Sequence, residues 1–160
     1  MSANDSTWAA VEGFRLPAVS AAAAAEIRQS YSGSSILVAD DDPLNLEVAR
    51  MMLEATGLVV DTAADGAIAV AMAWQAHYAA ILMDMQMPNV DGLAATRQIR
   101  AIPGYLRTPI IAMTANTAAA ARTLCFEAGM NDFMTKPFDS GQFLGMLRHW
   151  LPRCDPQRTP

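Results

Sequence analysis

Cysteine is scarce in this chain, whose 160 residues include only Cys125 and Cys154. The two form neither a CxxC pair nor a disulfide framework, which excludes a disulfide-stapled scaffold and favours a reducing environment. Histidine is equally scarce. His77 and His149 have no further ligands at zinc spacing, so we interpret both as ordinary surface or helix-end side chains.

Positive charge is also in short supply. Eleven Lys and Arg against sixteen Asp and Glu give a formal net charge of −5. Such a surface does not attract phosphate backbones or anionic membranes, so neither a nucleic acid nor a membrane is expected as a partner. Long hydrophobic runs are missing, and Asp5 and Glu12 stand where a signal peptide has basic residues. We expect an acidic, soluble, cytoplasmic domain.

Apolar residues are abundant, at 52%, which is enough for a core and excludes a mostly disordered chain. The length fits one domain plus a tail. Residues 1–33 differ from the rest, with an alanine run at 21–25 and a Ser/Gly-rich exit. We expect a linker or the tail of a preceding domain there, because a short helix would have few large apolar residues to anchor it. The main domain is placed at 34–152 and a C-terminal tail at 153–160.

From residue 35 onward, short apolar runs alternate with segments of helical spacing. Strands are expected at 36–39, 58–60, 79–83, 110–113 and 132–134. Helices are expected after each of them, with Asp42, Asp65 and Asp139 as N-caps and further helices over 91–102 and 117–128. Pro43 at a first helical position and Ile68 and Met72 at helical spacing support two of these helices.

This alternation predicts an α/β fold with a parallel sheet covered on both faces. Crossovers must be right-handed. The expected architecture is a flavodoxin-like, doubly wound (βα)5 fold with strand order 2-1-3-4-5. Its ligand site should lie outside the carboxyl ends of the first and third strands.

Chemistry-bearing residues follow four of these strands. Asp40 and Asp41 follow the first, Asp84 the third, Thr114 the fourth and Lys136 the fifth. Three close carboxylates repel unless a cation compensates, and oxygen-only ligands select Mg²⁺ or Mn²⁺. A carboxylate nucleophile, a metal and an ammonium together suit phosphoryl transfer. Any single Asp could instead be a helix cap or a turn residue, and Asp42 is interpreted as a cap.

Four segments also form a recognisable set: 36–43 (ILVADDDP), 83–88 (MDMQMP) with Asp91-Gly92, 113–115 (MTA) and 133–138 (FMTKPF). Together, over about residues 34–151, they resemble the receiver domain of two-component response regulators. The resemblance implies that Asp84 accepts a phosphoryl group from a histidine kinase, that Thr114 bonds the phosphoryl oxygen and that Lys136 pairs with it. A cis peptide before Pro137 is also expected.

The resemblance further implies a metal site for Mg²⁺ or Mn²⁺. Asp41 matches the direct ligand, Asp40 its acidic neighbour acting through water, and Gln86 the position whose backbone carbonyl completes the metal shell around Asp84. Phe133 falls at the switch position. A plain core aromatic is an equally good interpretation of it.

Two contexts fit such a receiver: a hybrid sensor histidine kinase, which the motifs resemble more, or a stand-alone phosphorelay carrier, since no output domain follows the last helix. Implied partners are a histidine kinase and a histidine-containing phosphotransfer domain, with the receiver a monomer or weak dimer. Two alternatives stay open. An aspartyl-phosphate phosphatase would need a second Asp where Gln86 stands, and a pseudo-receiver would not need the full residue set.

Overall fold

The computed structural model describes residues 21–115, 118–136 and 140–151. Within them a five-stranded parallel sheet has the order β2-β1-β3-β4-β5, which confirms the predicted doubly wound fold. The strands are β1 (Ser35–Ala39), β2 (Val59–Ala63), β3 (Ala80–Asp84), β4 (Ile110–Thr114) and β5 (Asp132–Thr135). The helices are α1 (Ala21–Tyr31), α2 (Pro43–Glu54), α3 (Gly66–Gln75), α4 (Gly92–Arg100), α5 (Ala119–Ala128) and α6 (Ser140–Trp150).

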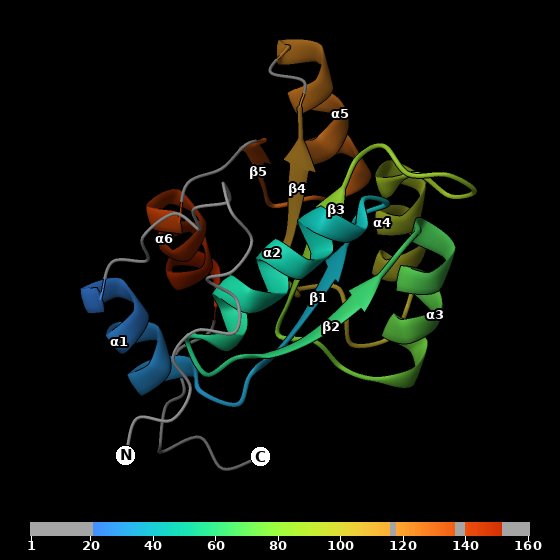
Figure 1. Cartoon of the computed structure of the whole chain (residues 1–160). Helices are drawn as coiled ribbons and strands as arrows, with labels where there is room; N and C mark the ends of the chain where they lie inside the picture. Colours follow the sequence, from blue (N-terminus) through green and yellow to red (C-terminus); the bar gives the residue numbers. More distant parts are fainter. Residues whose placement is uncertain (1–20, 116–117, 137–139, 152–160) are drawn as a thin grey trace.

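The helices cover both faces of the sheet (Figure 1). Successive side chains of a strand point to opposite faces, so Ile36 and Val38 of β1 pack in one core with α1, α2 and α6. Leu37 and Ala39 pack in the other core with α3, α4 and α5. None of the helices within the described residues has the length and apolar character needed to span a lipid bilayer.

Aspartate side chains begin three of the helices. Asp42 accepts a hydrogen bond from the Leu44 N–H at 2.9 Å, and Asp65 accepts one from the Ile68 N–H at 2.8 Å. Both predicted caps are therefore confirmed. Asp91 caps α4 in the same way. The third predicted cap, Asp139, lies outside the described residues, as does Pro137.

Small residues, and not the large apolar ones, form the buried face of α3. Ala69, Val70 and Ala73 are buried, whereas Ile68 is 44% exposed and Trp74 is 63% exposed. A Cβ at Gly66 would clash with the Val90 carbonyl, so the start of α3 needs glycine to lie this close to the loop before α4.

The expectation that little could anchor a helix in residues 1–33 is wrong for α1. Ile27 and Tyr31 are fully buried in the core that α6 also lines, and α1 and α6 lie side by side (Figure 1). An ion pair of 2.7 Å joins Glu26 to Arg148 of α6, and the Arg28 guanidinium donates to the Ala55 carbonyl. The domain boundary at residue 34 stays a prediction, but α1 packs on the same core.

Candidate functional site

The carboxyl ends of β1, β3, β4 and β5 meet at one edge of the sheet. Asp40 directly follows β1 and its N–H donates to the Ala63 carbonyl. Asp84 and Thr114 are the last residues of β3 and β4. Because β1 and β3 are neighbours in register, Ala39 beside Met83, the carboxylates that follow them are brought together. The strand order thus collects the predicted residues at the expected topological switch point.

Lys136 holds the two buried carboxylates together. Its Nζ lies 2.7 Å from Asp40 Oδ2 and 3.2 Å from Asp84 Oδ2. Asp40 is 1% exposed and Asp84 6% exposed, whereas Asp41 faces solvent. One carboxylate oxygen from each of the three aspartates lies within 4.8 Å of the others. The structure therefore joins three negative charges and one positive charge at this edge.

Backbone N–H groups and one amide orient the buried carboxylates. Asp40 Oδ1 accepts from the Asp42 N–H at 2.9 Å, and Asp40 Oδ2 accepts from Asn45 Nδ2 at 3.3 Å. Asp84 Oδ1 accepts from the Gln86 N–H at 3.3 Å. The sequence interpretation missed Asn45. Its place in the first turn of the helix that follows the acidic run was the available signal.

Burial and crowding make the Asp84 carboxylate less acidic. Desolvation, with the nearby Asp40 charge second, raises the pKa of Asp84 to about 6, although the Lys136 ammonium works in the opposite direction. For Lys136 itself, burial acts to lower the pKa, but the hydrogen bonds and charges of Asp40 and Asp84 outweigh burial and raise it. The ammonium is therefore held charged between two carboxylates and does not neutralise them fully.

The donor chemistry of this cluster fits a hard divalent cation. Asp40, Asp41 and Asp84 supply only oxygen atoms, which Mg²⁺ and Mn²⁺ prefer. One ammonium leaves two of the three negative charges uncompensated, and a divalent ion would balance them. The role expected for the Gln86 carbonyl stays a prediction.

Thr114 and Phe133 lie on the neighbouring strands β4 and β5. Thr114 is 5% exposed, and its carbonyl accepts from the Lys136 N–H at 2.8 Å, which ties the two strand ends together. Phe133 is half-buried, and the Arg122 guanidinium carbon lies 4.4 Å from its ring centroid. This cation–π contact across α5 and β5 was not expected from the sequence.

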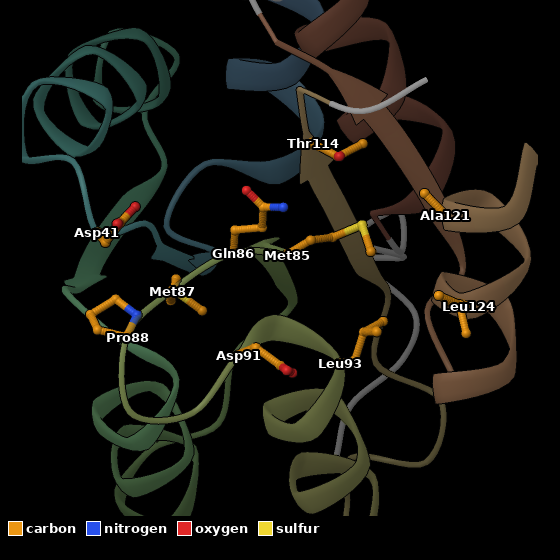
Figure 2. Close-up of a pocket in the computed structure, with 10 residues that line it drawn as sticks. All are labelled: Asp41, Met85, Gln86, Met87, Pro88, Asp91, Leu93, Thr114, Ala121 and Leu124. Carbon is orange, nitrogen blue, oxygen red and sulfur yellow. The ribbon is translucent and has the colours of Figure 1, made fainter. Parts of the chain in front are cut away.

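Described residues line two hollows at this edge. The acidic one, about 650 Å³, is lined by the aspartates, Asn45, Thr114 and Lys136. The second, about 680 Å³, lies beside it between the end of β3, α4 and α5 (Figure 2). A Cβ at Gly92 would clash with the Asp84 carbonyl, so only glycine lets α4 start directly against the end of β3 and form one wall.

Comparison with known proteins supplies independent evidence. A family model described as the response regulator receiver domain matches residues 36–148. The chain is 33% identical over 124 residues to the signal transduction histidine-protein kinase BarA of Escherichia coli, covering 78% of this chain. It is 41% identical over 121 residues to the transcriptional regulatory protein ResD of Bacillus subtilis, covering 76% of this chain. The chain spans only 14% of BarA and 49% of ResD.

Among solved structures, the receiver domain of the sensor histidine kinase PA1611 from Pseudomonas aeruginosa is 44% identical, with a TM-score of 0.70. The match covers 74% of this chain and 98% of that one, which carries a magnesium ion coordinated in its active site cleft. The chemotaxis protein CheY4 of Vibrio cholerae is 28% identical with a TM-score of 0.73, covering 75% of this chain and 100% of that one.

Proposed function

The chain belongs to the response regulator receiver family of two-component systems, and on that premise we propose that Asp84 accepts a phosphoryl group from a phosphohistidine of a partner protein. One observation carries the proposal. Asp84 ends β3 with its carboxylate 3.2 Å from an ammonium and beside two further carboxylates that suit a divalent cation. A carboxylate nucleophile between cationic groups is the arrangement that phosphoryl transfer requires.

In the proposed step an Asp84 carboxylate oxygen attacks phosphorus, the phosphorus–nitrogen bond of the phosphohistidine breaks, and the imidazole leaves with the bonding electron pair. Lys136 would pair with a phosphoryl oxygen, since its ammonium already contacts Asp84. The Thr114 hydroxyl, at the end of the adjacent strand, would donate to another phosphoryl oxygen. Phe133, on β5, would then respond as the switch residue.

Asp40, Asp41, Asp84 and the Gln86 carbonyl would hold Mg²⁺, or Mn²⁺, at this site. A cation bound by these residues would supply charge neutralisation for phosphoryl transfer. The three carboxylates within 4.8 Å of one another support this part of the proposal.

The parent of this domain is proposed to be a hybrid sensor histidine kinase that works with a histidine-containing phosphotransfer domain. The 44% identity to the receiver of a sensor histidine kinase supports this context, and BarA is also a kinase, whereas ResD, at 41% identity, is a transcriptional regulatory protein. We also propose a cytoplasmic location, because a histidine kinase draws its phosphoryl group from ATP and ATP is available in the cytoplasm.

Mass spectrometry after incubation with Mg²⁺ and acetyl phosphate tests the proposal. The wild-type chain should gain one acid-stable, base-labile phosphate, and Asp84→Asn should gain none. Repeated turnover of the donor would indicate a phosphatase instead, and an unlabelled wild type would indicate a pseudo-receiver. Full labelling of Asp84→Asn would show that the acceptor is another residue.

A further inference from the structure

The direction of the Gln86 carbonyl, a proposed metal ligand, depends on the rest of the β3–α4 loop, residues 85–91 (Figure 2). Gln86 itself is exposed, and its N–H donates to Asp84 Oδ1 at 3.3 Å. Its carbonyl belongs to the peptide that joins it to Met87, which is buried in the same core as Ala69 of α3. The packing of the loop against α3 therefore bears on the metal site.

The start of α3 contacts the middle of this loop directly. The Gly66 N–H donates to the Val90 carbonyl at 3.1 Å, and Asp65 Oδ2 accepts from Asn89 Nδ2 at 3.0 Å. The Val90 N–H in turn donates to the Pro88 carbonyl at 2.8 Å. Two residues at one helix start therefore hold three consecutive residues of the loop.

The residue types at these contacts suit the approach of the loop to α3. Asn89 has a φ of 65°, a left-handed conformation that asparagine tolerates better than most residues, and its side chain is bonded to Asp65. Gly66 is the first residue of α3, where alanine would be the better helix former. A Cβ there would fall on the Val90 carbonyl oxygen and lie 3.1 Å from Val90 Cβ. Glycine at this position therefore serves the loop and not the helix.

We propose that Asp65 and Gly66 are positioning residues for the metal site, because through Asn89 and Val90 they hold the β3–α4 loop with the Gln86 carbonyl toward the acidic hollow. The inference rests on the proposed function and adds α3 to the elements that build the site. Among the described residues that line the acidic hollow, neither Asp65 nor Gly66 is present, so both act through the loop. Residues that orient a metal ligand commonly change metal affinity about 10- to 100-fold when they are replaced.

A pair of glycine variants tests the close approach of α3 to the loop. Gly66→Ala adds the Cβ that would displace the Val90 carbonyl, and Gly145→Ala is the matched control, because a Cβ at Gly145 of α6 meets no atom within 4 Å. Isothermal titration calorimetry measures the Mg²⁺ dissociation constant of each variant. We expect Gly66→Ala to raise this constant about tenfold and Gly145→Ala to leave it unchanged.

Variants of Asp65 separate its bond to Asn89 from its role as the cap of α3. Asp65→Ser keeps a capping oxygen but is too short to reach Asn89, whereas Asp65→Asn keeps both contacts once the two amides are oriented to match. Asp91→Ser is the matched control, because it replaces the capping aspartate of α4 and changes nothing at the start of α3. We expect Asp65→Ser to raise the Mg²⁺ dissociation constant about threefold, as for the loss of one ordinary hydrogen bond, and the other two variants to stay near wild type.

A measurement on the loop itself distinguishes positioning from a general loss of stability. In EDTA, the backbone amide signal of Gln86 in ¹H–¹⁵N spectra should shift in Gly66→Ala and Asp65→Ser, whereas the signal of Leu82, inside β3, should stay in place. Labelling of both variants by acetyl phosphate should return toward the wild-type rate as the Mg²⁺ concentration is raised.

The affinities and the Gln86 signal together decide the outcome. Wild-type affinity and an unshifted Gln86 signal in both Gly66→Ala and Asp65→Ser would overturn the positioning role, and Asp65→Ser decides alone if Gly66→Ala does not fold. An equal loss of affinity in Asp65→Ser and Asp91→Ser would also overturn it, because the lost charge would then be the cause. A wild type that neither binds Mg²⁺ nor is labelled by acetyl phosphate would instead overturn the proposed function.

Discussion

Replacing Asp84 by Asn should stabilise the metal-free protein at neutral pH. The folded protein holds the Asp84 carboxylate at 6% exposure next to Asp40, and burial followed by that charge raises its pKa from 3.8 to about 6. A raised pKa means that folding disfavours the ionised form. Each pKa unit corresponds to 1.36 kcal/mol, so the ionised Asp84 costs on the order of 3 kcal/mol of folding free energy above pH 6.

The sign follows from proton binding. Between about pH 3.8 and 6 the folded state holds a proton on Asp84 that the unfolded state has released, so wild-type stability falls as pH rises through this window. Asn carries no charge at any pH, and its oxygen can still accept from the Gln86 N–H. Lys136 keeps a carboxylate partner in the variant, because its Nζ remains 2.7 Å from Asp40 Oδ2.

Urea unfolding of both proteins in EDTA, from pH 4 to 7.5, measures the effect. The variant should match wild type near pH 4 and exceed it by about 1 to 3 kcal/mol at pH 7.5. Glu127→Gln, which removes one exposed carboxylate from α5, should show no comparable pH-dependent gain. A pH-independent difference, or a more stable wild type at pH 7.5, would refute the reasoning, because attraction to Lys136 would then outweigh burial and repulsion.

Three further predictions concern the metal, α1 and assembly. Mg²⁺ at 100 times its dissociation constant should stabilise the wild type by about 2.7 kcal/mol in a thermal-shift assay. This gain should be smaller below pH 6, where Asp84 becomes protonated. Asp41→Ala should lose the gain and still fold, because Asp41 is exposed. Tyr31→Ala should lower the free energy of unfolding by about 3 kcal/mol against the exposed control Gln29→Ala; an unchanged value would mean that α1 is dispensable. The protein should sediment as a monomer or weak dimer with beryllofluoride, since Arg148 of α6 is already paired with Glu26; a tight dimer would contradict this.

The sequence predicts β1, β3, β4 and β5 to within one residue at each end. β3 and β4 are buried along their whole length, so their apolar runs were unambiguous. β2, at the edge of the sheet, extends to Ala63 where the prediction stopped at residue 60, because Asp61 and Thr62 break the apolar run. The site was predictable from the topological rule, since each residue follows a strand and the strand order brings the strand ends together.

Contacts between residues far apart in sequence were not predictable. Tyr31 lies against Arg148, 117 positions away, so local composition gave no sign that the alanine-rich helix has a partner. The contact between Arg122 of α5 and Phe133 of β5 likewise depends on how the helix packs against the sheet. Hydrophobic periodicity identifies a helix in the sequence, but only tertiary packing determines which side chains that helix contacts.

The crowding of buried carboxylates around Asp84 lowers the stability of the folded protein, and it also makes the site sensitive to any change of charge at Asp84. Because burial and the Asp40 charge raise the pKa of Asp84 to about 6, any group that neutralises its carboxylate, such as a proton or a cation, stabilises the folded protein. Lys136 contacts Asp40 and Asp84 from the end of β5, and its N–H is bonded to the Thr114 carbonyl of β4. A change of charge at Asp84 therefore acts directly on the ends of β4 and β5, the strands that lead to α5 and α6.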